Sequence, residues 1–338
     1  MKVDAGIGYE QDFHDLRQLA GRVKQFEAQS FDGLMVAEIA HDPFPALTIA
    51  AYESEKLELR TSIALALARN PMSMAYMAHE LNALSEGRFT LGMGSQIRAH
   101  ITRRFCMPWY GPAKQMKEYV EALKAIWDCW YDGKALNYEG EHYQYDLMTP
   151  EFVPTNIEYG RPRIAVAAVG PLMTKTVAQV ADGIIVHSFC SRKHLQEVVV
   201  PSIERHLADA GRNREDFEIQ YAPFMATGET EEAIAKAKEE IRYRIGFYGS
   251  TPAYRTVLET HGWGDLQTEL RALTKENRWQ DLGSLVTDEV LEAFTCSGEP
   301  VQMAAQMRDW FDGKIDRTTI GSELSPEIVA QQLAVLKY

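Results

Sequence analysis

A histidine between two carboxylates is the first group of residues in this chain that could do chemistry. The stretch Glu38-Ile39-Ala40-His41-Asp42 stands at the end of an apolar segment. The imidazole pKa lies near neutrality, so His41 can take or give a proton during a reaction, with Glu38 beside it. The alternative is that His41 is a turn residue capped by Asp42 and that Glu38 is a structural ion-pair partner. The residue types leave both interpretations open.

Gly170-Pro171 marks a second candidate site, because an apolar run ends there and a helix-like segment follows. Gly170 lets a ligand approach the backbone, and Pro171 starts a helix at a position that needs no amide. The amides of Leu172, Met173 and Thr174 then point outward at the positive end of the helix dipole, which suits a phosphate group. A plain tight turn is the simpler interpretation of Gly-Pro on its own.

The sequence Gly92-Met93-Gly94-Ser95 follows another apolar run. A dinucleotide-binding fingerprint would need a third glycine where Ile97 stands, so the motif is weak evidence for a Rossmann domain. In a barrel, the two glycines would more simply keep the end of a strand clear for a flat ring.

His187, Cys190 and His194 have spacings that could suit zinc. No fourth ligand is obvious nearby, and His187 would end a strand whereas His194 would lie in the following helix. We therefore expect no metal site, and we interpret His187 as a residue that lines a substrate pocket. Trp109, in an aromatic group, is another candidate for this lining, although packing below a loop is the commoner role of such residues.

Composition excludes several classes of partner. The chain has 338 residues and a formal net charge of -13, so binding to nucleic acid or to an anionic membrane is not expected. No apolar run approaches the roughly 18 residues of a membrane span, and the N-terminal segment lacks the apolar core of a signal peptide. The four cysteines are scattered, which fits a reducing cytoplasm. We expect a cytoplasmic protein that acts on a small molecule.

Strand-like and helix-like segments alternate along the chain, which predicts a parallel sheet covered by helices on both faces. The number and size of these units indicate an α/β fold of the (β/α)8 TIM-barrel type. A hairpin around Glu139-Gly140 interrupts the alternation. The eight expected strands are residues 2–8, 33–38, 57–67, 88–94, 163–169, 183–189, 217–228 and 315–321.

The chain is longer than eight strand-helix units require, and the additional residues lie in two stretches, at about 132–160 and about 245–312. Neither is separated by a low-complexity linker, so we interpret both as insertions in one domain that covers residues 1–338. In such a barrel, the reactive groups gather at the carboxyl ends of the strands. The candidate residues named above fall at these ends.

Three segments resemble the bacterial luciferase-like superfamily. LRTSIALALARNPMSMAYMAHELNALSEGRFTLGMGS is similar to its third-to-fourth-strand segment, with an NP-led helix followed by LS-x-GR-F-x-LG-x-G. AAVGPLMTKTVAQVADGII resembles its GP…ADG segment, and GEHYQYD resembles the hairpin after its fourth helix. The matches run in the right order over roughly residues 1–190, whereas the region after 245 shows none.

Within this superfamily, AEIAHDPF, ALARNPM and GSQIRAHITRRF look most like the branch that uses the 8-hydroxy-5-deazaflavin coenzyme F-420. That resemblance implies hydride transfer to or from a small organic substrate, of the paired-donor or CH-OH type. Other branches use FMN, so an FMN-dependent monooxygenase and a non-catalytic flavin-binding barrel remain alternatives. Because barrels of this family often pair, we also expect a homo-oligomer, a dimer or a tetramer.

The resemblance also implies roles for particular residues. A non-proline cis peptide at Ser62-Ile63 would back the deazaflavin ring, and Gly94, Ser95 and Gln96 would lie beside it. The phosphate would bind at the turn formed by residues 170–173. Deazaflavin-dependent sugar-phosphate dehydrogenases carry a glutamate where Ile97 stands here, and their aspartate-histidine pair after the second strand is shifted in this chain. The substrate is therefore not expected to be the same sugar phosphate.

Overall fold

Eight parallel strands close into a barrel in the computed structural model, which describes residues 1–7, 15–321 and 324–337. Neighbouring strands pair in the order of the chain, and the last barrel strand pairs with the first. The predicted (β/α)8 fold is therefore confirmed. The barrel strands are β1 (Lys2–Ile7), β2 (Gly33–Val36), β3 (Glu58–Thr61) with its continuation β4 (Ala64–Leu65), β5 (Phe89–Gly94), β8 (Arg163–Ala168), β9 (Gly183–Val186), β10 (Glu218–Tyr221) and β13 (Arg317–Thr319).

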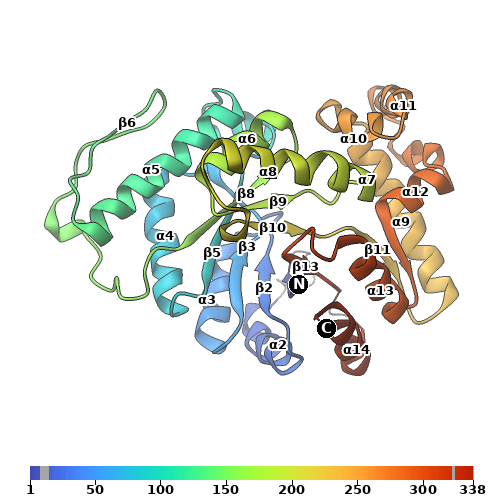
Figure 1. Cartoon of the computed structure of the whole chain (residues 1–338), viewed down its shortest axis with the longest axis horizontal. Helices are drawn as coiled ribbons and strands as arrows, with labels where there is room; N and C mark the ends of the chain where they lie inside the picture. The colour runs from blue at the N-terminus through green and yellow to red at the C-terminus, as the bar shows by residue number, and fades with distance from the viewer. Residues whose placement is uncertain (8–14, 322–323, 338) are drawn as a thin grey trace.

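Helices surround the barrel (Figure 1). Several begin with a side-chain cap followed by proline at the first turn, as the Asn70-Pro71 pair predicts: the Asn70 side chain accepts a hydrogen bond from the Ser73 amide at 2.8 Å. None of the helices among the described residues combines the length and apolar character that crossing a bilayer requires. The helices are α2 (Leu16–Ala28), α3 (Pro43–Glu53), α4 (Pro71–Leu84), α5 (Pro112–Asp132), α6 (Pro171–Val180), α7 (Arg192–His194), α8 (Val200–Asp209), α13 (Pro300–Phe311) and α14 (Pro326–Lys337).

The first insertion contains the expected hairpin. Strands β6 (Tyr138–Glu139) and β7 (Gln144–Tyr145) pair antiparallel, and the Gly140 amide bonds to the Tyr143 carbonyl at 2.8 Å. This arm extends away from the barrel at the left of Figure 1.

The second insertion differs from the expected one at both ends. The strand expected at 217–228 is divided: β10 stays in the barrel, Pro223 follows, and β11 (Phe224–Thr227) pairs in parallel with β12 (Thr295–Gly298). Proline has no amide to donate, so the barrel ladder does not continue through it. Between β11 and β12 lie α9 (Glu231–Gly249), α10 (Arg255–Glu259), α11 (Gly264–Lys275) and α12 (Asp288–Phe294). Helix α13, inside the expected insertion, packs its buried residues into the barrel's apolar cluster.

The segment from β11 to β12, hereafter the insertion, has an apolar cluster of its own. This cluster includes Phe224, Ile241, Ile245 and Phe294, and one residue that follows a barrel strand, Phe189. The rings of Phe189 and Phe294 stack with centroids 4.8 Å apart. Phe189 therefore anchors the insertion to the barrel beside the end of β9.

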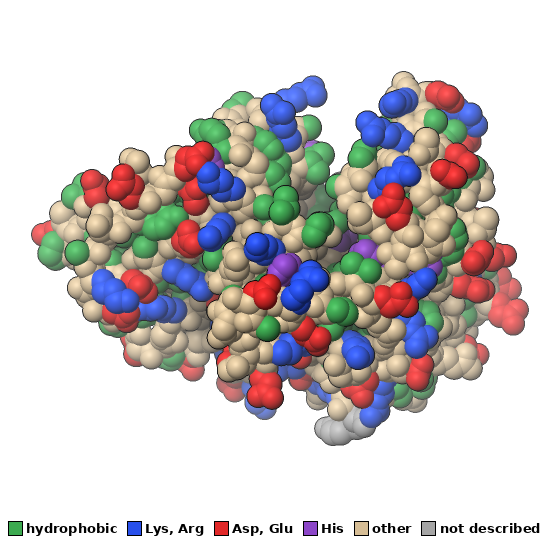
Figure 2. All heavy atoms as spheres, turned by 45° about the horizontal axis from the view of Figure 1, so that its top comes forward, with side chains coloured by type: hydrophobic (Ala, Val, Ile, Leu, Met, Phe, Trp, Pro, Cys, Tyr) green, Lys and Arg blue, Asp and Glu red, His purple; other side chains and the backbone are tan. Residues whose placement is uncertain are grey.

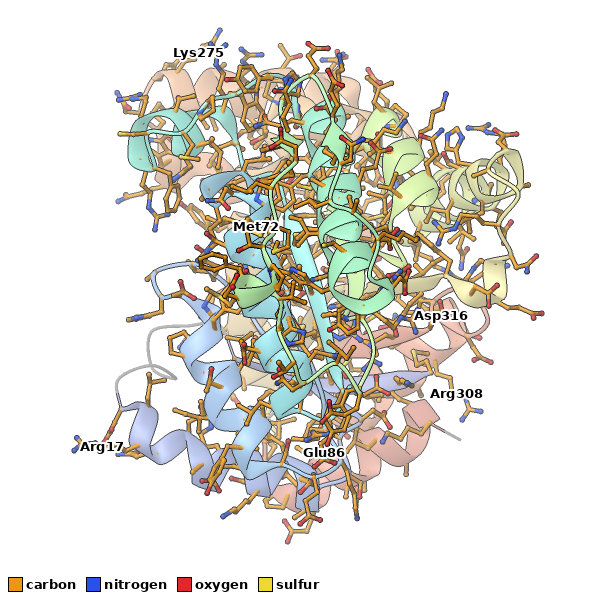
Figure 3. All side chains as sticks on the ribbon, turned by 90° about the vertical axis from the view of Figure 1, so that its left-hand side faces the viewer. Arg17, Met72, Glu86, Lys275, Arg308 and Asp316 are labelled. Carbon is orange, nitrogen blue, oxygen red and sulfur yellow. The ribbon has the colours of Figure 1, made fainter. Side chains whose placement is uncertain are left out.

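Figure 3 shows on which side of the barrel the insertion lies. Met72, at the start of α4, and Lys275, at the end of α11, lie toward the upper left of the view. Glu86, which precedes β5, and Asp316, which precedes β13, lie toward the lower right. The insertion is therefore on the side of the strands' carboxyl ends.

Charged side chains fill the centre of the barrel. The apolar character of the strand segments did not predict these charges. Arg60 bonds to Glu218 at 2.7 Å and to Gln220 at 2.9 Å. Arg317, fully buried, bonds to Glu218 at 3.1 Å and also pairs with Asp4. Although burial raises the pKa of Glu218, Arg60 and Arg317 together lower it to about 2. These side chains come from β1, β3, β10 and β13 and form one connected network.

Replacing Arg317 with methionine should destabilise the fold by about 3–5 kcal/mol, because it leaves buried carboxylates without their cation. Urea unfolding followed by circular dichroism measures this loss. Arg278→Met is the matched control, since Arg278 is more than half exposed and its surface ion pairs should contribute at most about 1 kcal/mol. Equal unfolding midpoints for the two variants would contradict a structural role for the network.

Candidate active site

The third barrel strand is interrupted at Ser62 and Ile63, where the resemblance places a cis peptide. The bond between these two residues is cis. The Ser62 amide donates to the Val36 carbonyl at 2.8 Å, and the Ile63 carbonyl accepts from the Glu38 amide at 3.2 Å. Strand β2 and the residues after it therefore hold this bulge on one side.

The Thr61 hydroxyl holds the bulge on the other side. It accepts a hydrogen bond from the Gly92 amide at 2.9 Å and donates one to the Gly92 carbonyl at 2.7 Å. A Cβ atom on Gly92 would lie 1.9 Å from the Thr61 carbonyl oxygen, so only glycine fits at this position. A side chain thus replaces the backbone ladder between β3 and β5 where the bulge separates them.

Glu38 holds the bulge from a third direction. Its carboxylate accepts from the Leu65 amide at 2.8 Å and pairs with Arg69 at 2.7 Å, and its side chain is buried. Arg69 also pairs with Asp42 at 2.7 Å, and Asp42 in turn caps α3 through the Phe44 amide. This geometry matches the interpretation of Glu38 as a structural ion-pair partner.

His41 lies between these two carboxylates in the sequence, and its side chain is exposed in the loop that leads to α3. The loop follows β2, so His41 is on the carboxyl side of the barrel, where sequence reasoning places the reactive groups.

Gly94 ends β5 next to the bulge. A Cβ atom at this position would lie 2.1 Å from Cδ1 of Ile63, so Gly94 leaves room for the Ile63 side chain. Ser95 and Gln96 follow and are half-buried. The backbone turns at Gln96, whose φ is 57°, and its side chain accepts from the Ile97 amide at 2.9 Å. The structure thus brings residues 62, 63 and 94 together.

The start of α6 is open. No side chain caps it, and a Cβ atom on Gly170 would meet no protein atom within 4 Å. The Thr174 amide bonds to the Gly170 carbonyl at 3.0 Å, so it is not available to a ligand as the sequence suggested. Among the described residues, the amides of Leu172 and Met173 have no backbone partner, and the Leu172 side chain is 74% exposed.

His187 follows β9 and is neutral at physiological pH. Burial, with a smaller effect of Arg244, lowers its pKa to about 4. Nδ1 accepts a hydrogen bond from the Phe189 amide at 2.9 Å, so the proton of the neutral ring is on Nε2. Tyr248 and Tyr254 of the insertion contact the imidazole, with ring centroids 4.7 and 5.1 Å away.

The other candidates at this edge have structural partners. His194 Nδ1 lies 2.7 Å from the Thr260 hydroxyl, and Trp109 is half-buried against the barrel's apolar cluster. Among residues 1–7, 15–321 and 324–337, no three His, Cys, Asp or Glu side chains are grouped to hold a metal ion. Sequence reasoning missed Thr61, which lies inside a quoted motif, and the two insertion tyrosines, for which no motif exists.

Family comparison gives these features a context. The family model described as luciferase-like monooxygenase matches residues 1–317. The chain belongs to this family. An uncharacterised protein of Mycobacterium tuberculosis is 46% identical over 317 residues, which cover 94% of this chain and 92% of that protein. The 5,10-methylenetetrahydromethanopterin reductase of Archaeoglobus fulgidus is 26% identical and covers 90% of this chain and 89% of its own length.

Solved structures of the same fold include both kinds of enzyme. The coenzyme F-420-dependent tetrahydromethanopterin reductase of Methanopyrus kandleri has a TM-score of 0.76 at 21% identity, covering 98% of this chain and 97% of that one. EDTA monooxygenase of Chelativorans has a TM-score of 0.75 at 15% identity, covering 100% and 93%. At these identities the likeness shows the luciferase-like barrel, a fold used by oxidoreductases and monooxygenases.

Thr61→Val should lower the free energy of unfolding by about 1–3 kcal/mol, because it leaves the Gly92 amide and carbonyl without their partner. Thr318→Val is the matched control. Thr318 is also a buried barrel threonine, but its hydroxyl has no hydrogen-bond partner, so its loss should cost little. Thermal and urea unfolding measure both, and a control that loses as much as Thr61→Val would contradict the bridging role.

Stability should fall as the pH is lowered from about 6.5 toward 4. His187 and His194 each have a pKa near 4 when folded, whereas the unfolded chain binds these protons near pH 6.5. The unfolded state then holds more protons, so each histidine lowers the free energy of unfolding by up to about 1.4 kcal/mol per pH unit in this window. Urea unfolding across the window measures the slope. His187→Phe should make it shallower, and an unchanged slope would argue against a lowered pKa.

Proposed function

We propose that this chain is a coenzyme F-420-dependent oxidoreductase that transfers hydride to or from a small organic substrate. The proposal rests on two features at the carboxyl ends of the barrel strands. One is the bulge at Ser62-Ile63 beside Gly94, and the other is the uncapped start of α6 at Gly170. Relatives with named activities support the choice of coenzyme. One is the Archaeoglobus reductase, and another is the F-420-dependent glucose-6-phosphate dehydrogenase of Intrasporangium calvum, 22% identical over 88% of this chain.

The residues present fit such a coenzyme. Because Gly94 has no side chain of its own, the Ile63 side chain lies over it, and together they offer an apolar surface at the strand end that suits a flat ring system. The space above Gly170 and the amides of Leu172 and Met173 suit a phosphate, which a helix start attracts by its dipole. When bound, coenzyme F-420 supplies a hydride or accepts one at C5 of its ring.

The chain's own groups would then orient the reactants and move the proton. We assign the proton to His41, whose exposed imidazole lies on the same side of the barrel and is of a residue type that can give or take a proton. Glu38 instead fixes the bulge through Leu65 and Arg69, so its effect on the reaction is one of positioning. His41→Ala should therefore lower turnover far more than coenzyme affinity, in assays with the reduced coenzyme and a panel of alkenes, imines and ketones.

Titration of the purified protein tests the coenzyme. Coenzyme F-420 fluorescence should be quenched on binding, whereas FMN should bind at least about tenfold more weakly. Gly170→Val should weaken F-420 binding, since the side chain enters space that no protein atom occupies and so leaves the fold intact. Gly21→Val, on the exposed face of α2 and equally free of neighbours, is the control and should bind as the unchanged protein does.

Other outcomes of this titration point to other functions. Tight FMN binding with NADH-dependent oxygen uptake would indicate a monooxygenase. Coenzyme binding without reduction of any substrate would indicate a non-catalytic barrel. Equal F-420 affinity in the Gly170→Val protein would reduce this turn to a structural connection.

A further inference from the structure

Three rings from two parts of the chain meet beside the carboxyl end of β9. His187 follows this strand, whereas Tyr248 ends α9 and Tyr254 precedes α10 in the insertion. Each ring contacts the other two: the centroids of the tyrosines are 6.0 Å apart, and each lies about 5 Å from the imidazole. Barrel and insertion therefore build this cluster jointly.

The cluster presents polar atoms that the protein does not use. His187 Nε2 and the hydroxyls of Tyr248 and Tyr254 have no hydrogen-bond partner among the described residues. None of the three is sealed inside the protein, because all buried polar atoms without a partner belong to other residues. Half-buried polar atoms of this kind gain free energy when a ligand or water bonds to them.

The electrostatics favour an electron-rich oxygen in the ligand. Because the Phe189 amide fixes the tautomer, His187 presents an N–H donor at Nε2 and no free acceptor. The positive charge of Arg244 on α9 acts on the same imidazole, so a cationic ligand is disfavoured. A carbonyl oxygen is the acceptor that suits this donor.

Aromatic side chains surround the cluster and favour a flat ligand. Phe189 lies 5.3 Å from Tyr254, and Phe224 stacks near Tyr248 with centroids 6.3 Å apart. Such surfaces prefer stacked or edge-on contacts with another ring. His187, Tyr248 and Tyr254 are each half-buried, so a ligand can reach the cluster from solvent. Figure 2 shows a notch in the surface of the molecule with histidine side chains in it.

We propose that His187, Tyr248 and Tyr254 bind a flat conjugated ring that carries a carbonyl oxygen, with the oxygen accepting from His187 Nε2. The inference rests on the proposed function in one respect: this ligand is the substrate of the hydride transfer. The binding site itself requires only the apo-protein. It also gives the insertion a role, because two of the three rings belong to it.

Two uncharged two-ring probes test the site. Coumarin carries a conjugated carbonyl, whereas naphthalene has no acceptor. Fluorescence titration should show that coumarin binds more tightly, and that His187→Phe weakens coumarin by about tenfold or more while naphthalene changes less than about twofold. Tyr254→Phe should weaken coumarin in the same sense. Tyr243→Phe, on the exposed face of α9, is the control and should alter neither probe.

The same variants separate this site from the coenzyme site. His187→Phe should leave F-420 affinity unchanged, since the coenzyme is assigned to residues 62–63, 94 and 170–173. If coumarin binding depends on His187 while F-420 does not bind, the ring site stands and the proposed function fails. If coumarin does not bind, or if His187→Phe weakens both probes equally or neither, the ring site is overturned, whatever F-420 does. Circular dichroism of each variant confirms that the fold is retained.

Discussion

Two arginine side chains at the centre of the barrel constrain how its strands close. Arg60 and Arg317 are almost completely buried and share Glu218, while Asp4 lies beside both. Ion pairs of this kind add little stability over apolar packing of the same volume, but a register that separated the charges would bury them unpaired. The network also requires a glycine at position 33, since a Cβ atom on Gly33 would lie 2.6 Å from the Asp4 carboxylate.

This network connects the middle of the barrel to the bulge at its edge. Gln220 accepts from Arg60 and donates to the Ser62 hydroxyl at 3.1 Å. Thr61 and Glu38 then hold the residues on either side of the bulge, through Gly92 and Leu65. The proposed ring surface is therefore supported by polar contacts from β5, from β10 across the barrel and from Glu38 after β2, and its shape is set before any ligand arrives.

Alternating apolar segments were enough to predict the barrel, because each parallel strand is covered on both faces and reads as a short apolar run. The Asn70-Pro71 helix start also followed from the sequence, whereas the bulge position followed from the family resemblance. The partners of Glu38 did not, because Arg69 is 31 residues away and only the fold brings the two together. The inward orientation of the arginines in β3 and β13 could not be predicted for the same reason, because their carboxylate partners lie on other strands. The rings at 248 and 254 lie in a segment that matches no motif.

The insertion leaves the barrel through β11 and returns to it through β12, and these two strands pair with each other in parallel. Its apolar cluster is separate, and a single aromatic residue of the barrel, Phe189, joins it. Mutations could therefore accumulate between these two strands during evolution without disturbing the closure of the barrel. A lineage could in this way exchange the molecules it recognises while keeping the proposed coenzyme site.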